Sequence, residues 1–161
     1  MDGTYVCLAA DGTQVSTNCS TIGNQDYSLD GSVCGFLSDG TLYCSSNGEV
    51  QRVADEVAGF AVSVDGSAIV YISNVGDDHY GTLSRYTVSD GSSKEITTQA
   101  LYDSDFPFLI ASPDGNSVAF LSDLNEDEER FEASISVNQG NPTTLGTNLL
   151  PLAISNDGTY I

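Results

Sequence analysis

The sequence contains no tryptophan, a single histidine and only four lysine or arginine residues against 23 aspartates and glutamates. The resulting formal charge of -19 repels phosphate backbones and anionic lipid heads, which argues against nucleic-acid and membrane partners. No long uncharged apolar run occurs, so no membrane-inserted segment is expected. Because 40% of the residues are nevertheless hydrophobic, we expect a soluble globular segment.

Catalytic and metal-binding signatures are also scarce. The only histidine, His79, lies in the polar stretch "NVGDDHYG" (74–81), and no Gly-x-Ser-x-Gly elbow is present. The cysteines form no C-x₂-C pair, which argues against zinc. We therefore predict that the chain is not an enzyme and has no cofactor, with Ca²⁺ as the exception considered below.

All four cysteines fall within the first 44 residues, at Cys7, Cys19, Cys34 and Cys44. An even, clustered count is typical of exported, oxidised proteins. No signal peptide is visible after Met1. Since "MDGTYV" at the start resembles "NDGTYI" near the end, we expect a fragment cut twice at the same point of a repeat.

Disulfide pairing remains open at this stage. A two-residue turn at Asp39-Gly40 places Cys34 opposite Ser45, one position from Cys44, and a β-bulge would correct that offset. Cys7 and Cys19 flank a second turn, and other pairings such as Cys7 with Cys34 are alternatives.

The chain repeats the motif Ser-x-Asp-Gly four times, at residues 28–31, 63–66, 112–115 and 155–158. The glycines stand at positions 31, 66, 115 and 158, so the intervals between them are 35, 49 and 43 residues. Periods of this size are typical of propellers and solenoids.

The residues around each motif predict β-strands. Apolar residues alternate before the motif, as in Leu109 and Ala111, and a nearly continuous apolar strand follows it, as in "NSVAFLS". Two further strands follow, the last short and polar, which makes four strands per unit, as in one propeller blade. Residues 49–57 also fit a helical face, but their position matches the fourth strand of the other units.

The stretch "ASPDGNSVAFLSDLNEDEERFEASISVNQGNPTTL" resembles the PD40 repeat, a WD40-like unit of TolB-like β-propellers. The resemblance is best over residues 107–147 and least over residues 1–57. It implies an all-β fold of antiparallel four-stranded blades. In that family the blades serve as binding platforms or as gating domains on peptidases, so the resemblance indicates architecture more than activity.

On this interpretation the chain is a single propeller segment with about three complete units and partial units at both ends. The predicted units are residues 1–26 (partial), 27–57, 58–106, 107–147 and 148–161 (partial). Either the chain is an excerpt of a larger propeller, or its two partial units combine into a shared fourth blade. Open sheet edges in an excerpt favour a homodimer.

One acidic loop has spacing that suits Ca²⁺. Asp123, Asn125 and Asp127 alternate along the chain, which lets an extended loop direct oxygens to one ion. The loop lacks the glycine and glutamate of an EF-hand, and a solvated loop is the alternative.

Two groups of aromatic residues have different predicted roles. Tyr71 and Phe120 recur at one strand position and are expected to pack between blades. Tyr102, Phe106 and Phe108 lie in or beside the long connection "LYDSDFPF" (101–108), which we predict to be an exposed binding loop.

Together these features predict a non-catalytic binding or scaffolding module that presents loops to a protein, peptide or glycan. The predicted location is extracellular or at the cell surface of a bacterium. The alternatives are the substrate-gating propeller of a multidomain exported peptidase and a Ca²⁺-stabilised adhesion module.

Overall fold

The computed structural model describes residues 3–8, 14–19, 23–105, 108–125 and 130–158, with side chains described from residue 23 onward. Every regular element in this part is a β-strand, so the predicted all-β class is confirmed. Across the same residues, no helix has the length and apolar character needed to cross a membrane.

Fourteen strands occur in the described part of the chain. They are β1 (Gly3–Leu8), β2 (Gln14–Cys19), β3 (Gln25–Tyr27), β4 (Val33–Ser38), β5 (Thr41–Ser46), β6 (Glu49–Ala54), β7 (Val57–Val62), β8 (Ala68–Ser73), β9 (Tyr80–Thr87), β10 (Ser92–Leu101), β11 (Leu109–Ala111), β12 (Val118–Asn125), β13 (Arg130–Ser136) and β14 (Thr143–Thr147).

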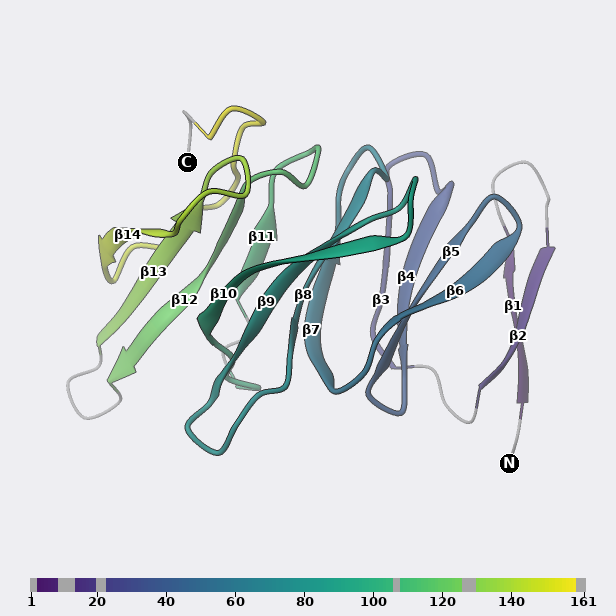
Figure 1. Ribbon diagram of the computed structural model, residues 1–161, viewed down its shortest axis with the longest axis horizontal. Helices are drawn as coiled ribbons and strands as arrows, with labels where there is room; N and C mark the ends of the chain where they lie inside the picture. The colour runs from purple at the N-terminus through teal and green to yellow at the C-terminus, as the bar shows by residue number, and fades with distance from the viewer. Residues whose placement is uncertain (1–2, 9–13, 20–22, 106–107, 126–129, 159–161) are drawn as a thin grey trace.

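These strands form three antiparallel four-stranded units after a β1–β2 hairpin. The units are β3 to β6, β7 to β10 and β11 to β14, each a meander in which consecutive strands pair. The last two units share one hydrogen-bonded sheet through the pair Leu101–Leu121. Figure 1 shows the units side by side along the long axis, as successive propeller blades are.

Each unit buries its second strand on both faces. All six residues of β8 are buried, as the continuous apolar run predicts, because neighbouring units cover both sides of the sheet. Tyr71 and Phe120 are 5% and 1% exposed, which confirms their predicted packing role. Residues 49–54 form β6, so the strand interpretation of that stretch is confirmed.

The hydrophobic core lies between units rather than within one sheet. One cluster joins Leu42 and Cys44 of the β3–β6 unit to Ile69 and Tyr71 of the next. A second joins the β7–β10 unit to Phe120. Complete burial of side chains of this size contributes about 1.5–3 kcal/mol each, so the stacking of units supplies much of the stability.

Glycines let aromatic rings approach the neighbouring backbone closely. A Cβ added at Gly35 would lie 2.7 Å from a ring carbon of Phe60, and one added at Gly59 would lie 2.8 Å from Tyr102. In each pair the aromatic ring packs directly on the glycine backbone and comes from a unit or connection later in the chain. The absence of a side chain therefore sets the distance between units.

The partial units at the two ends do not meet. β2 contacts β6, whereas Ile154 is 3% exposed and packs against Ala119 and Ile135 of the last unit. Figure 1 places the two ends of the chain at opposite ends of the molecule. The described residues therefore do not form the alternative shared fourth blade, because the row of units stays open and each partial unit packs on a different end of it.

Candidate binding edge at the Asp-Gly corners

Each of the first three Ser-x-Asp-Gly motifs forms a compact corner between the first and second strands of a unit. The Ser63 hydroxyl donates to Asp65 Oδ1 (2.9 Å) and accepts from the Ala68 N–H (2.9 Å). The Ser67 N–H donates to the same carboxylate oxygen (2.9 Å), and the Gly66 N–H donates to the Ser63 carbonyl (3.0 Å). Gly66 has a φ of 72°, which a side chain would disfavour.

The same bonds recur at the other corners. Ser112 donates to Asp114 Oδ1 (2.7 Å) and accepts from the Ser117 N–H (2.9 Å). Ser28 donates to Asp30 Oδ1 (2.8 Å) in the same way. The three serines are 0% to 3% exposed, so these hydroxyls are interior groups whose bonding capacity is used within the corner.

Successive corners are also hydrogen-bonded to one another. The Leu29 N–H donates to the Val64 carbonyl (2.8 Å), and the Asp65 N–H donates to the Pro113 carbonyl (3.0 Å). The Asp114 N–H donates to Asn156 Oδ1 (3.1 Å). We name this continuous row, made of residues 28–32, 63–67, 112–116 and 155–158, the corner edge.

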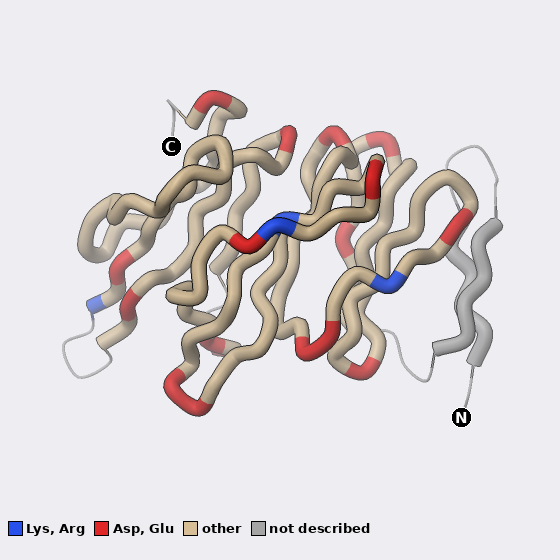
Figure 2. Tube along the Cα trace, viewed as in Figure 1, with Lys and Arg blue, Asp and Glu red and all other residues tan. Residues whose placement is uncertain are grey.

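The corner edge is negatively charged at neutral pH. The backbone N–H and hydroxyl of Ser32 lower the pKa of Asp30 to about 2. Partial burial raises the pKa of Asp65 and of Asp114, but hydrogen bonds from neighbouring residues outweigh it and lower both values overall. Figure 2 shows acidic residues on the corner turns and also on the loops at the opposite edge.

Arg85 is the one cation built into this edge in the described part of the chain. It extends from β9 and is only 7% exposed. Its Nε donates to the Gly115 carbonyl (2.9 Å), and its Nη1 donates to Thr87 Oγ1 (2.7 Å). Burial lowers its pKa, while the carboxylates of Asp114 and Asp65 raise it. The side chain therefore ties the β7–β10 unit to the next corner.

A cavity of about 390 Å³ opens beside Arg85, between the β3–β6 and β7–β10 units. Its walls are polar and apolar in similar measure and come from the first two corners, the β5–β6 hairpin and the end of β9 with the turn that follows it. This size lies at the lower end of the range of small-molecule sites. The cavity therefore gives the corner edge a recess of ligand size.

The opposite edge carries a second recess, of about 340 Å³, with His79 and Asp103 on its wall. His79 is exposed, with a φ of 65°, and its described hydrogen bonds are made by its backbone, to Gly76 and Tyr102. The expectation that His79 lies in a solvent-facing loop is confirmed.

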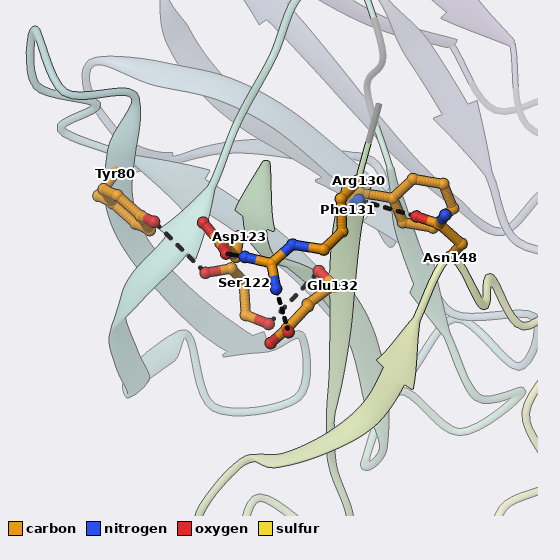
Figure 3. A network of polar contacts seen from close by, with 7 residues as sticks. All are labelled: Tyr80, Ser122, Asp123, Arg130, Phe131, Glu132 and Asn148. Atoms are coloured by element: carbon orange, nitrogen blue, oxygen red, sulfur yellow. Dashed lines mark hydrogen bonds and ion pairs between the residues drawn. The ribbon is translucent and has the colours of Figure 1, made fainter. Parts of the chain in front are cut away.

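The predicted Ca²⁺ residues lie in a strand end held by an arginine. Arg130 Nη2 lies 3.3 Å from Asp123 Oδ2, and Nη1 lies 3.7 Å from Glu132 Oε1. Figure 3 shows the guanidinium between the two carboxylates. Asn125 pairs with Arg130 across β12 and β13, and Asp127 lies outside the described residues.

This ion-pair arrangement gives Asp123 a cationic partner from its own sheet. Over the described ranges, no group of three or more His, Cys, Asp or Glu side chains is arranged to hold a metal ion. Figure 3 also shows Tyr80, whose hydroxyl lies 3.5 Å from the Ser122 carbonyl, and Asn148, which accepts from the Phe131 N–H (3.0 Å). The network therefore joins three strands and a loop.

The predicted aromatic binding loop is exposed at Ser104 and Asp105, whereas its described aromatic rings are partly buried. Tyr102 packs on Gly59 and on the core between the second and third units. Phe108 packs against the cluster of Ala119 and Ile135. Both rings are thus partly buried, because neighbouring units cover part of each, and a binding role for this connection stays a prediction. Phe106 lies outside the described residues.

Cys34 and Cys44 do not form the hairpin disulfide. β4 and β5 pair without a bulge, so Cys34 faces Ser45 and Gly35 faces Cys44. The two thiols consequently join different core clusters on opposite faces, and both are buried. Burial raises the pKa of Cys44 to about 11. The side chains of Cys7 and Cys19 lie outside the described residues.

Arg85 is the site residue that sequence reasoning missed. The available signal was its place in "TLSRYTV", in alternation with Leu83, in a chain with few cations. A basic residue in phase with buried positions of a strand needs interior acceptors. Which carbonyl accepts its hydrogen bond depends on the neighbouring unit, which the strand pattern does not reveal.

Comparison with known proteins shows similarity of fold. No protein-family model and no curated protein sequence matches the chain. Among solved structures, TolB from Acinetobacter baumannii matches with a TM-score of 0.56 and 18% identity, over 89% of this chain and 42% of that chain. A putative TolB from Agrobacterium tumefaciens matches with a TM-score of 0.54 and 20% identity, over 89% and 60%.

The β-propeller domain of the Trilobed protease from Pyrococcus furiosus matches with a TM-score of 0.57 and 14% identity, over 81% of this chain and 43% of that chain. The chain thus spans about half the length of the propellers it resembles. At these identities the likeness concerns the fold. Together with the repeated corners and stacked four-stranded units, it shows that the chain has a β-propeller fold similar to that of TolB.

Proposed function

We propose that the chain is a non-catalytic binding or scaffolding module that presents its turns to a protein, peptide or glycan. The hydrogen-bonded corner edge is the observation that carries this proposal. It fixes four turns relative to one another before any partner arrives, which lowers the entropy that binding must overcome. A fixed platform of this kind suits recognition.

The side chains on the corner edge also suit a docking face. The second residues of the first two corners are apolar yet exposed: Leu29 is 86% exposed and Val64 is 47% exposed. Ionised aspartates stand beside them. Apolar contacts ringed by fixed charges are typical of protein interaction sites, and here they favour a partner with complementary positive charge.

The environment of the nucleophile-type residues supports a non-catalytic role. The corner serines donate to aspartates within their own turns, and these hydroxyls are buried. His79 is exposed, and the β8–β9 connection that contains it lies at the opposite edge from the β7–β8 corner (Figure 1). A Ser–His mechanism needs the two groups within hydrogen-bond reach.

The proposed setting is outside the cytoplasm of a bacterium, at the surface or in the extracellular medium. The TolB-like fold and the acidic, lysine-poor composition support this location. A signal peptide or anchor encoded upstream in the gene would be the expected finding. A gene that encodes neither would contradict it.

We propose further that a second copy of the chain covers the exposed C-terminal half-unit. Leu152 is 95% exposed and Leu149 is 57% exposed, beside the buried Ile154. When two copies of the chain associate through this surface, the exposed leucines of both copies become buried. Light scattering at rising concentration should show a dimer, and a monomer at high concentration would contradict it.

The binding role can be tested with printed arrays of peptides and of glycans. The wild-type chain should bind to either the peptides or the glycans more strongly than an unrelated protein of equal negative charge does. Reversal of charge at the corner edge, as in Asp30→Lys, should change that binding, whereas Glu95→Lys on the exposed part of β10 should not. Turnover of peptides or glycosides, or binding equal to the control on both arrays, would contradict the proposal.

A second candidate function is the propeller portion of a larger peptidase. The similarity to the β-propeller domain of the Trilobed protease favours it, since the likeness covers 43% of that chain. The sequence of the gene on both sides of this segment discriminates the two functions. A downstream α/β-hydrolase domain would favour the peptidase role.

A further inference from the structure

The recess at the edge opposite the corner edge combines acidic and apolar groups. It has a volume of about 340 Å³ and lies where the end of the second unit meets the third. The β8–β9 loop, the end of β10, the connection after it and the end of β12 form its wall. The described residues on that wall are Asp78, His79, Tyr80, Leu101, Asp103 and Leu124. The recess is therefore built from parts of two units.

Strand pairing fixes the apolar part of this wall. Leu101 is 6% exposed and pairs with Tyr80 on one side and with Leu121 on the other. Tyr80 and Leu124 are half-buried. Because Leu101, Tyr80 and Leu124 all line the recess, they give it an aliphatic and aromatic surface that an apolar chain can cover.

Two loops bring carboxylates to the same wall, and Figure 2 shows the acidic β8–β9 loop at this edge. The Tyr80 N–H donates to Asp78 Oδ1 (3.2 Å), and the Asp105 N–H donates to Asp103 Oδ1 (2.7 Å). These bonds tie both carboxylates to the backbone of their own loops. Burial raises the pKa of Tyr80, and the charges of Asp123 and Asp78 raise it further, so the phenol stays neutral. The fixed charges at this wall are therefore negative.

None of the chain's four lysine and arginine residues lies on the described wall of the recess. All four make polar contacts with other parts of the chain, namely Arg52, Arg85, Lys94 and Arg130. A cation that balances the two aspartates must therefore come from solution or from a partner. His79 also lines the recess, and its imidazole can accept a hydrogen bond from such a cation when it is neutral.

The combined wall selects an organic cation with an aliphatic stem. An anion is repelled by Asp78 and Asp103. A bare metal ion finds no suitable group of three or more ligands among the described residues, and it covers no apolar surface. A lysine or arginine side chain meets both needs, because its methylene groups pack on apolar surface while its charged end reaches a carboxylate. A recess of about 340 Å³ has room for one such side chain.

We propose that this recess binds a lysine or arginine side chain presented by a protein or peptide partner. The charged end lies between Asp78 and Asp103, and the methylene groups lie on the apolar part of the wall. The proposal rests on the binding-module function and deepens it, because it selects a protein or peptide as the partner and names the side chain that is recognised.

The test is a titration of the isotope-labelled wild-type chain, followed by backbone amide shifts. The probes are N-acetyl-lysine methylamide and N-acetyl-arginine methylamide. N-acetyl-norleucine methylamide supplies the stem without the charge, and methylammonium supplies the charge without the stem. A basic probe should shift the amides of residues 78–80 and 101–103, with a Kd at least about fivefold lower than that of either control. A control that binds equally well, or no shifts there from the basic probes, would overturn the proposal.

Pentylamine distinguishes a side chain of a partner from a free amine, because it has the stem and charge of lysine without the peptide groups. It should bind no more tightly than the capped lysine. Tighter binding of pentylamine would assign the recess to a small amine and so overturn the proposed partner.

Two variants separate this site from a general attraction of cations to an acidic protein. Asp78→Asn and Asp103→Asn each remove one charge but keep an oxygen that can accept the same backbone N–H. Each should weaken binding of the capped lysine by about five- to tenfold. Glu95→Gln removes the same charge from the exposed part of β10 and should leave the Kd unchanged. Equal weakening in all three variants would overturn the proposed site. Shifts confined to the corner edge would do the same while leaving the binding-module function intact.

Discussion

Asp65 and Asp123 show how the two edges of this molecule differ. Asp65 is held by hydrogen bonds from Ser63 and Ser67, both within its own corner. Asp123 has as its partner Arg130, seven residues away on the next strand, and the two side chains are each 40% exposed. Local bonds repeat whenever the motif repeats, whereas the Arg130 pair occurs once. The corner edge is thus the constant part of the fold, and the opposite edge varies between units.

The contrast between buried and open corners gives the largest expected effect. Gly115 has a φ of 64°, and an added Cβ would lie 2.7 Å from Ala68 and 3.1 Å from Ser63. Gly115→Ala should lower the free energy of unfolding by about 2–4 kcal/mol, from the disfavoured backbone conformation together with overpacking. Denaturation in urea measures it.

Gly31→Ala is the matched control for that substitution. Gly31 has a similar φ of 70°, but no atom of the described residues lies within 4 Å of an added Cβ. Its cost should be about 1 kcal/mol, from the backbone alone. Equal losses in the two variants would show that the corners are not stacked against neighbouring units.

The next largest effect should come from the buried serine hydroxyls. Ser112→Ala removes the acceptor of the Ser117 N–H and a donor to Asp114, at a residue with 0% exposure. The unfolding free energy should fall by about 1–3 kcal/mol because a buried N–H loses its partner. Ser155→Ala at the last, more open corner should cost less. The opposite ranking would contradict the interior role of the hydroxyl.

The contrast between local and distant bonds also explains which parts of the fold could be predicted from the sequence. The bonds within each corner were predictable because they join residues at most five positions apart, as Ser112 and Ser117 show. The strands were predictable from their apolar patterns. The packing of Tyr102 on Gly59 was not, since it depends on how closely two units approach. The face of Cys44 depended on whether β4 and β5 contain a bulge, which neither strand's residues specify.

The acid stability of the chain should reflect the corner carboxylates. The pKa of Asp30 is lowered to about 2, and the pKa values of Asp65 and Asp114 are lowered as well. A lowered folded-state pKa stabilises the fold above the unfolded value of about 4, and this contribution is lost as the pH falls toward 2. Unfolding free energy should therefore decrease over that window.

Asp30→Asn sharpens this prediction. Between about pH 4 and pH 2 its unfolding free energy should depend less on pH than that of the wild type, because one shifted carboxylate is gone. Glu95→Gln, which removes the same charge from the exposed part of β10, serves as the control. A slope unchanged by Asp30→Asn would show that the corner bonds to Asp30 do not stabilise the fold.

The smallest effect is expected at the opposite edge. Asp123→Asn breaks a half-exposed ion pair and should cost less than about 1 kcal/mol. Since Arg130 already supplies a cation to Asp123, addition of millimolar Ca²⁺ after chelation should leave the Tm of the wild type unchanged. A Tm that rises with Ca²⁺ in the wild type but not in Asp123→Asn would contradict the ion-pair account. It would favour the Ca²⁺-stabilised adhesion module instead.

The central claim is that equivalent corners of successive units are bonded into one row. Amide hydrogen exchange followed by NMR tests it most directly, because the Leu29 and Asp65 N–H groups lie in turns and donate across units to Val64 and Pro113. The neighbouring Val64 N–H, which has no acceptor among the described residues, is the internal reference. We predict strong protection at Leu29 and Asp65 and fast exchange at Val64. Exchange at Leu29 and Asp65 as fast as at Val64 would contradict the claim.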